Sequence, residues 1–293
     1  MDIKLDCYKD REGNVIKKDI VSEDSLRFMY TNPVGRMVLS IMGSKTMAMV
    51  QQLFLDSPLS TLIIDPFVKK NEISLKDYVP RKYVSFNDFF TREIRSDRRK
   101  FECGKDNLIS PSDGRVTAYK INHKSNFRIK NSVYTVGSLL RDSSLADYYK
   151  DGYFVLIRLC VDNYHHYAYA VSGLKSSERR INGFLHSVNP VVYDYTKVYK
   201  ENTRCYSVIK TDEGERIVQM EVGAMGVGKI CNRQVNEVEV VQGHKKGHFE
   251  FGGSSIILLL PKGSYVPDED ILKNTAEGYE TEVKIGEKIG SRN

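Results

Sequence analysis

Apolar and polar residues recur with two different periods along this 293-residue chain, and the change of period divides it into two parts. In the first part, apolar residues recur at helical spacing after Thr31-Asn32-Pro33. This tripeptide combines a capping side chain with a first-turn proline, which is typical of a helix start. The apolar positions that follow it are Val38, Ile41, Met42, Met49 and Leu53. They predict a helical region with one apolar face.

A shorter apolar segment, residues 59–64, begins after Ser57-Pro58 and is expected to stop at Asp65-Pro66. Further on, Ser85 is expected to cap a short helix whose aromatic side chains pack inward. Five of the eight methionines lie between Met29 and Met49. Flexible methionine side chains suit irregular apolar partners such as lipid. Two interpretations therefore stay open for these helices: packing on the protein's own core, or contact with a membrane surface.

The second part of the chain consists of short β-type runs separated by turns. The runs cover residues 115–121, 153–160, 167–171, 206–210, 216–222, 238–241, 247–251 and 255–260. Asp212-Glu213-Gly214 is expected to connect two of them as a hairpin, and a helix over 138–149 interrupts the series. The pattern predicts an α+β fold, in which an N-terminal helical region over residues 1–105 precedes a largely antiparallel, β-rich body over 106–293.

Composition narrows the class of protein. With 41% hydrophobic residues, the chain is long enough to bury a real core. Its five cysteines are scattered and form no CxxC pair, which favours reduced thiols and argues against both a disulfide scaffold and a zinc site. The first residues do not have the pattern of a secretory signal, and no window approaches the ~18 consecutive apolar residues of a spanning helix. These features predict a protein that is soluble or bound at a membrane surface.

The net charge of +6 favours an anionic surface over a cationic one. Because no recognised nucleic-acid motif accompanies this charge, a nucleic-acid partner is not expected. Basic residues concentrate between Arg92 and Lys100, and we interpret this run as a solvated face.

Four short segments carry groups that suit catalysis. Gly252-Gly253-Ser254-Ser255 precedes an apolar strand, so it is either a bulge or a place where a serine attacks its own chain. Ser110-Pro111-Ser112-Asp113-Gly114 is either a tight turn or the source of a catalytic carboxylate. His165 and His166 are adjacent on a predicted strand, so at most one of them enters a given pocket. His186 ends a further apolar run.

A metal site is not expected from the histidine spacing. His244 and His248 are spaced as helical ligands, but Gly243, Gly247 and the flanking strands argue against a helix there. The histidines considered for proton transfer are His165, His166 and His186.

In sequence order, seven segments resemble the motifs of the self-cleaving, pyruvoyl-dependent phosphatidylserine decarboxylases. They are Phe86-Asn87-Asp88-Phe89-Phe90-Thr91-Arg92-Glu93, Ser110-Pro111-Ser112-Asp113-Gly114, Asp162-Asn163-Tyr164-His165, Ser187-Val188-Asn189-Pro190, Glu201-Asn202-Thr203-Arg204, Glu221-Val222-Gly223-Ala224 and Phe249-Glu250-Phe251-Gly252-Gly253-Ser254-Ser255. The resemblance runs from about residue 30 to the C-terminus.

The resemblance implies roles for individual residues. Self-cleavage is expected between Gly253 and Ser254, and Ser254 is then the precursor of a covalent pyruvoyl cofactor. Asp113 resembles the carboxylate of a hydroxyl–histidine–carboxylate relay, and His165 is expected to act as acid or as both acid and base. The family's second histidine, its usual base for self-cleavage, corresponds to Ala168 in this chain, so the base is expected to come from elsewhere. His186, beside the matched Ser187-Val188-Asn189-Pro190, is the leading candidate, and the alternative is a copy that cuts slowly or not at all.

The implied activity is conversion of phosphatidylserine to phosphatidylethanolamine and carbon dioxide through a Schiff base on the pyruvoyl group. The expected enzyme is peripheral, on the cytoplasmic side of the cell membrane, where it meets phosphatidylserine. Its large and small chains are expected to stay associated, and assembly into a homo-oligomer is left open. Two alternatives remain: the same chemistry on another serine-headed lipid or a soluble amino acid, and a non-catalytic β-sandwich binding domain.

Overall fold

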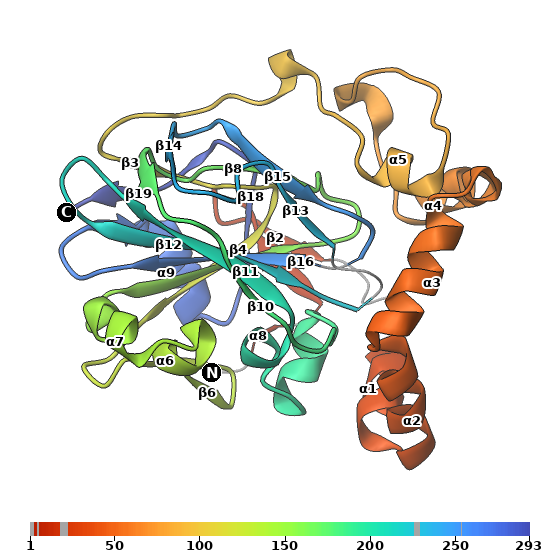
Figure 1. The fold of residues 1–293 in the computed structure, drawn as a ribbon, viewed down its shortest axis with the longest axis horizontal. Helices are drawn as coiled ribbons and strands as arrows, with labels where there is room; N and C mark the ends of the chain where they lie inside the picture. The colour runs from red at the N-terminus through yellow and green to blue at the C-terminus, as the bar shows by residue number, and fades with distance from the viewer. Residues whose placement is uncertain (1–2, 5, 18–22, 226–228, 253) are drawn as a thin grey trace.

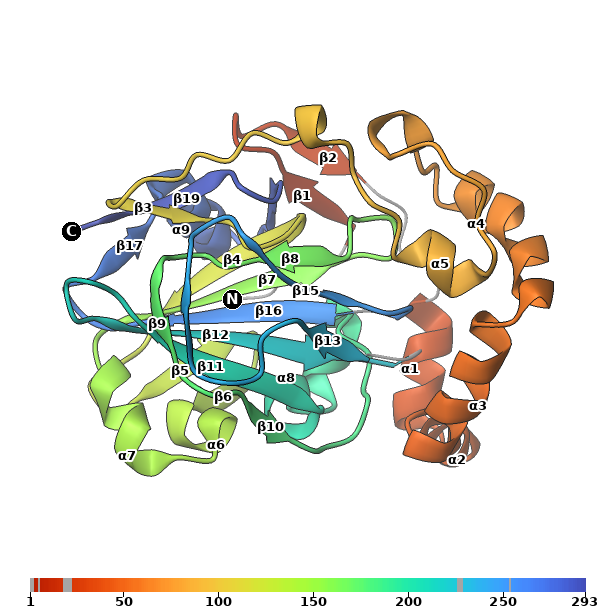
Figure 2. The ribbon, with the colours of Figure 1, turned by 45° about the horizontal axis from the view of Figure 1, so that its top comes forward.

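The helices of the N-terminal region lie to one side of a β-rich body in the computed structural model (Figure 1). The structure describes residues 3–4, 6–17, 23–225, 229–252 and 254–293. After a turn about the horizontal axis, the same helices still lie at the edge of the body (Figure 2). The strands of the body pair mostly antiparallel, which confirms the predicted α+β class and its order along the chain.

Local capping explains where the N-terminal helices begin. Asn32 caps the second of them by accepting a hydrogen bond from the Val34 N–H, and Pro33 occupies the first turn as predicted. Ser85 caps a short helix in the same way, also as predicted. The helical segments are α1 (Glu23–Thr31), α2 (Pro33–Met42), α3 (Lys45–Leu55), η1 (Pro58–Ile63), α4 (Ile64–Lys70), η2 (Leu75–Asp77), α5 (Phe86–Phe90) and η3 (Ser96–Arg98).

One helix boundary was predicted wrongly. The apolar segment expected to stop at Asp65-Pro66 continues as α4 to Lys70. Pro66 lies in the first turn of α4. Backbone N–H groups of a first turn have no partner within the helix, so proline, which has no N–H, loses no hydrogen bond there. Proline therefore does not end the helix there.

Helices α2 and α3 expose their apolar side chains. Leu53 is 75% exposed and Leu62, in η1, is 76% exposed. Nine further apolar side chains among the described residues of α2 and α3 are exposed: Val34, Met37, Val38, Ile41, Met42, Met47, Met49, Val50 and Phe54. Among the described residues no single helix is long and apolar enough to span a membrane; one bent pair, Thr46–Leu55 with Pro58–Lys70, passes the length and composition criteria with a bend of 81°.

The centre of the body is an 11-stranded sheet, as far as the described residues show. Its order is β14-β9-β11-β12-β16-β7-β4-β18-β1-β2, with β10 also paired to β11. The strands are β1 (Cys7–Lys9), β2 (Val15–Lys17), β4 (Gly114–Lys120), β7 (Tyr153–Leu159), β9 (Gly173–Lys175), β10 (Arg179–Ile181), β11 (Arg204–Lys210), β12 (Arg216–Gly223), β14 (Val238–Val240), β16 (Ser254–Leu260) and β18 (Thr281–Val283). Pairing of Lys210 with Arg216 confirms the predicted hairpin between β11 and β12.

Three smaller sheets and several short helices cover the main sheet. The sheets are β13 (Ile230–Asn232) with β15 (Lys245–Phe249) and β8 (His166–Ala168); β17 (Tyr265–Pro267) with β19 (Lys288–Arg292) and β3 (Asn107–Ile109); and β5 (Asn126–Ile129) with β6 (Ser132–Thr135). The helices are α6 (Val136–Leu140), α7 (Ser143–Ala146), η4 (Asp147–Tyr149), η5 (Pro190–Asp194), α8 (Val198–Glu201) and α9 (Glu269–Ala276). The single helix predicted over 138–149 is broken at Arg141, whose φ of 49° ends α6.

Side chains of β16 alternate between two cores. Ile256, Leu258 and Leu260 enter the core between the main sheet and the β13–β15–β8 sheet, here called the strand-side core. Ile257 and Leu259 enter the core that α6, η5 and α8 cover, here called the helix-side core. Because strand residues alternate in direction, the Ser254 side chain points toward the strand-side core and Ser255 toward the helix-side core.

The N-terminal β-hairpin also belongs to the main sheet. β1 pairs with β18, with Lys9 opposite Thr281, and β2 pairs with β1. A division into domains at residue 105 stays a prediction. Residues 7–17, although N-terminal to that division, add two strands to the main sheet of the body.

Candidate active site

Ser254 is the first residue of β16, in the middle of the main sheet. It lies opposite Gly223 of β12 and opposite Leu159 of β7. Its side chain is fully buried, and its Oγ has no hydrogen-bond partner among the described residues. A buried hydroxyl without a partner costs about 1–3 kcal/mol, so such a group in a well-paired strand indicates a functional rather than a structural role.

The chain bends sharply just before Ser254. Gly252 has a φ of 136°, a conformation that L side chains rarely adopt. The first glycine of the pair, Gly252, thus permits the bend. Gly253 lies outside the described residues, and the predicted cut between Gly253 and Ser254 stays a prediction.

His165 is a neutral base in this structure. Its ring is fully buried, and its Nδ1 lies 2.9 Å from the carbonyl oxygen of Asn163. A carbonyl oxygen only accepts hydrogen bonds, so Nδ1 carries the proton and Nε2 keeps its lone pair. Burial and, next, the positive charge of Arg92 lower the pKa of His165 to about 3. Nε2 has no partner among the described residues.

Aromatic packing brings His165 to the segment that ends at Ser254. The Phe90 ring lies 4.2 Å from the His165 ring and 5.0 Å from the Phe251 ring, measured between centroids. The Phe249 N–H donates to the carbonyl oxygen of His165 at 2.9 Å. Phe251 is three residues before Ser254 in the chain. The unpartnered imidazole nitrogen and the unpartnered hydroxyl thus belong to the same part of the molecule.

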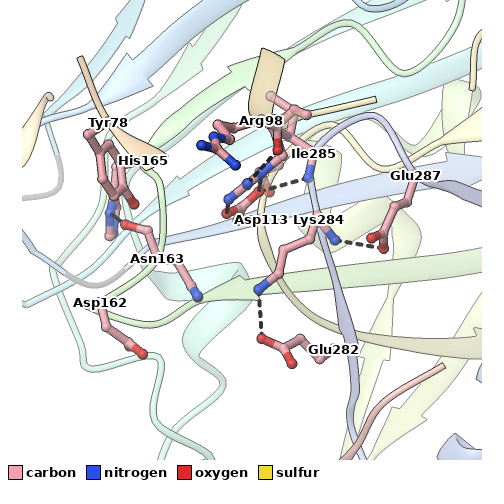
Figure 3. Close-up of polar contacts among 12 residues, drawn as sticks. Tyr78, Arg98, Asp113, Asp162, Asn163, His165, Glu282, Lys284, Ile285 and Glu287 are labelled. Carbon is pink, nitrogen blue, oxygen red and sulfur yellow. Dashed lines mark hydrogen bonds and ion pairs between the residues drawn. The ribbon is translucent and has the colours of Figure 1, made fainter. Parts of the chain in front are cut away.

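Asp113 lies in the turn before β4 and is held by three hydrogen bonds. Arg99 donates from Nη2 to Oδ2 at 2.7 Å and from Nε to Oδ1 at 3.2 Å, and the Ile285 N–H donates to Oδ1 at 2.8 Å. Figure 3 draws these contacts, and no dashed line in it joins Asp113 to His165. The described contacts therefore do not form the expected carboxylate–histidine pair, and a catalytic role for Asp113 stays a prediction.

The Asp113 turn does contact the strand position where the resemblance leads us to expect a second histidine. The Ala168 N–H donates to the carbonyl oxygen of Pro111 at 2.8 Å. A cavity of about 150 Å³ borders Ala168, Arg99 and Ile285. Asp113 hydrogen-bonds to two of these lining residues, Arg99 and Ile285, so Ala168 and Asp113 border the same part of the molecule.

His186 lies on the other side of the main sheet. Its ring packs against Phe184 at 4.5 Å between centroids, its Nδ1 lies 3.2 Å from Tyr30 Oη, and its Nε2 lies 3.4 Å from Glu201 Oε2. Tyr30 belongs to the helix-side core and Phe184 packs against it. Burial lowers the pKa of His186. No contact described for this ring reaches Ser254, and its role as base stays a prediction.

Two arginines near the site were misinterpreted from the sequence. The basic run that begins at Arg92 was predicted to be a solvated face, which is wrong for Arg92 and Arg99. Arg92 is 1% exposed, lies over the rings of Tyr78 and Phe89, and donates to the Asp162 carbonyl oxygen at 3.3 Å. Arg99 holds Asp113. The aromatic residues just before Arg92 were the available signal, because a guanidinium packs well on aromatic faces.

The fold and these residues define a class: an α+β protein whose central strand begins with a buried serine, next to a buried neutral histidine. Comparison with known proteins narrows that class. Residues 86–291 match the family model described as phosphatidylserine decarboxylase.

Full-length relatives give the same result. The chain is 41% identical over 269 residues to phosphatidylserine decarboxylase proenzyme 2 of Clostridium acetobutylicum, and the aligned region covers 92% of each chain. It is 33% identical over 293 residues to the phosphatidylserine decarboxylase proenzyme of Fusobacterium nucleatum subsp. nucleatum, and the aligned region covers 98% of each chain. It is 35% identical over 278 residues to the corresponding proenzyme of Clostridium beijerinckii, and the aligned region covers 93% of this chain and 94% of the relative. The chain belongs to the phosphatidylserine decarboxylase family.

The neutral state of His165 makes stability depend on pH. Its pKa is about 3 in the fold, below the 6.5 of an ordinary histidine, so between these values the unfolded chain holds a proton that the folded chain does not. The free energy of unfolding therefore falls as the pH falls from about 6.5 toward 3, by about 2 kcal/mol between pH 7 and pH 5 through this one group. We expect His165→Gln to remove about that much of the pH dependence, measured by urea unfolding at both pH values in a Ser254→Ala background.

The matched control is His123, which is exposed. Of the two variants, His165→Gln and His123→Gln, the first should show the weaker pH dependence. Identical pH dependence in the parent and in His165→Gln would contradict the buried neutral imidazole.

Proposed function

We propose that this chain is a self-cleaving, pyruvoyl-dependent decarboxylase that converts phosphatidylserine to phosphatidylethanolamine and carbon dioxide. Membership of the family and the names of its relatives support the substrate and the reaction. The observation that carries the proposal is the pair of unpartnered, fully buried groups Ser254 Oγ and His165 Nε2. A serine is a weak nucleophile without a base, and a neutral imidazole with a free lone pair is such a base.

In the proposed self-cleavage, Ser254 Oγ attacks the carbonyl carbon of Gly253. His165 Nε2 takes the hydroxyl proton, the carbon–nitrogen bond of the peptide breaks, and the released nitrogen receives a proton, so that an ester replaces the amide. Elimination then removes the Cα proton of residue 254 and breaks its Cβ–Oγ bond, which releases the Gly253 carboxylate as the new end of the large chain and leaves a dehydroalanine. Its imine tautomer reacts with one water molecule and loses ammonia, which gives the pyruvoyl group. His165 replaces His186 in this role because the His186 ring packs with the helix-side core, opposite to the direction of the Ser254 side chain.

The residues around Ser254 fit a pyruvoyl group. Gly223, directly opposite Ser254, has no side chain to fill the space beside it, and the other neighbour is the apolar Leu159. When present, the group supplies an electrophilic ketone that accepts the electrons left as carbon dioxide departs. His165 Nε2 is then positioned to move a proton to the product. A low pKa means that this imidazole returns a proton readily once it has taken one up.

Strand pairing supports an assembly in which the two chains remain together after the cut. The small chain would begin with β16, whose seven residues pair with β7 on one side and whose first six pair with β12 on the other. It would also contribute α9, β17, β18 and β19. Ladder hydrogen bonds and two cores hold these elements in the body.

Exposed apolar helices support a peripheral position on the cytoplasmic side of the membrane. The exposed side chains of α2, α3 and η1 suit the acyl region of a bilayer, and a net charge of +6 suits anionic headgroups. A phospholipid would then keep its acyl chains in the bilayer while its serine headgroup enters the body beside these helices. Assembly into a homo-oligomer remains open.

Mass spectrometry of the intact protein tests the self-cleavage. We expect two chains, the smaller one of 40 residues (254–293) without a free amino group at its start. Ser254→Ala should give one uncut chain, because alanine has no hydroxyl to attack with, whereas Ser255→Ala, on the other face of the strand, should still be cut. A single uncut chain with full decarboxylase activity would refute the proposal.

Two histidine variants identify the base. His165→Gln should slow self-cleavage about 10²-fold to 10⁴-fold, the usual contribution of a positioned general base. His186→Gln should change the rate less than about threefold, because its ring faces the helix-side core. Both rates can be followed on gels after synthesis. The opposite result, slow cleavage only in His186→Gln, would assign the base to His186.

The substrate is tested by carbon dioxide release from phosphatidylserine in vesicles and from free serine. We expect release from the vesicles only. Leu53→Asp combined with Leu62→Asp should weaken vesicle binding and activity at least about tenfold, since both side chains are exposed, while self-cleavage proceeds as before. Equal activity on free serine would favour a soluble amino acid as the substrate.

A further inference from the structure

A sulfur, a nitrogen and an oxygen donor lie together next to the segment before Ser254. The ligand atoms of Cys231, His248 and Glu250 all lie within 4.8 Å of one another. Strand pairing produces this arrangement: Cys231 on β13 is directly opposite His248 on β15, and Glu250 follows β15. The Cys231 thiol already donates to Glu250 Oε1 at 3.4 Å.

An independent feature of the neighbouring cavity also indicates a ligand. A cavity of about 500 Å³ is lined by Cys231, His248 and His166. His166 is 4% exposed, and its Nε2 lies 2.9 Å from the Thr91 carbonyl oxygen, so Nε2 carries the proton. Its Nδ1 therefore keeps a lone pair, and it has no partner among the described residues. The His166 and His248 rings stack at 5.2 Å between centroids.

We propose that Cys231, His248 and Glu250 form a binding site for a divalent transition-metal ion of the zinc type, open on one side to the cavity that contains His166. Thiolate, imidazole and carboxylate together are typical zinc ligands, and softer than the oxygen-only sets of magnesium and calcium. Ligand atoms around a tetrahedral zinc lie roughly 3.3–3.8 Å apart. Cys231 Sγ and Glu250 Oε1 already have such a separation at 3.4 Å, and a pair at the 4.8 Å limit needs to close in by about 1 Å. His166 or a water molecule supplies the fourth position.

Metal binding displaces the thiol proton of Cys231 and the ammonium group of Lys229 from the site. Burial and, next, the Glu250 carboxylate raise the pKa of the Cys231 thiol to about 12, so the thiol proton leaves only as the metal charge replaces it. Lys229 Nζ lies 2.8 Å from Glu250 Oε1 and must move away. Its side chain is about half exposed, so it can turn to solvent at small cost. Gln52 of α3 can keep its hydrogen bond to Glu250 Oε2.

The site would clamp the chain just before the proposed cut. Glu250 is four residues before Ser254, and Gln52 links it to the N-terminal helices. A bound ion would thus tie the last residues of the large chain to β13 and to α3. This consequence rests on the proposed cleavage, whereas the binding of the ion does not.

The proposal is tested with the full-length protein after treatment with a chelator. Equilibrium dialysis against Zn²⁺ should give one bound ion per chain, and Co²⁺ should give a sulfur-to-cobalt charge-transfer band in the near ultraviolet. Loss of an outer partner of a metal site costs about 10–100-fold in affinity, so Cys231→Ser, which removes a direct ligand, should cost at least about 100-fold and abolish the band. His248→Gln should weaken binding to a similar degree.

The control variant is Cys103→Ser, which removes an exposed thiol in another region and should leave the stoichiometry and the band unchanged. The band in the wild-type protein reports thiolate ligation even if a variant fails to fold. Absence of stoichiometric Zn²⁺ binding, absence of the band, or a band that persists in Cys231→Ser would each overturn the proposal. None of these readouts depends on cleavage or decarboxylation, so the metal site and the proposed function can fail separately.

Discussion

The pairing of β16 with β12 and β7 is the constraint on which the rest of the site depends. It holds Ser254 between Gly223 and Leu159 and directs its side chain toward the strand-side core. That direction decides which histidine is available, because His165 packs near the chain before Ser254 and the His186 ring belongs to the opposite core. The bend at Gly252 brings the chain into the strand at this position. Sheet geometry, more than any single contact, therefore selects the groups that we propose to react.

The site concentrates buried polar atoms that a stable core would avoid. Ser254 Oγ, Ser112 Oγ and His165 Nε2 have no partner among the described residues. Each such group reduces stability by about 1–3 kcal/mol. The surrounding body can offset this, since strands β7, β12 and β16 each carry apolar side chains into two cores. The hydroxyl and the neutral imidazole proposed to react are thus kept away from water by a large, well-paired sheet.

Much of this arrangement could be predicted from the sequence, because local signals carry it. Helical spacing and the capping side chains of Asn32 and Ser85 predicted the N-terminal helices, and short apolar runs predicted the main strands. Pro66 was misinterpreted because a proline ends a helix only beyond its first turn. Which histidine faces Ser254 depends on strand register and on which core each side chain enters, and neither is a local property. The grouping of Cys231 with His248 arises in the same way, from pairing of β13 with β15.

The central position of β16 has a consequence for how the molecule must be made. The strand that completes the middle of the sheet lies after the proposed cut, so the uncut chain folds as one molecule, whereas the cut protein would have to reassemble from two. Refolding would then depend on concentration, and lost small chains would not return. Once matured, such a protein is maintained by the slowness of its unfolding rather than by a reversible equilibrium. Its working lifetime is then set by the rate at which β16 leaves the sheet.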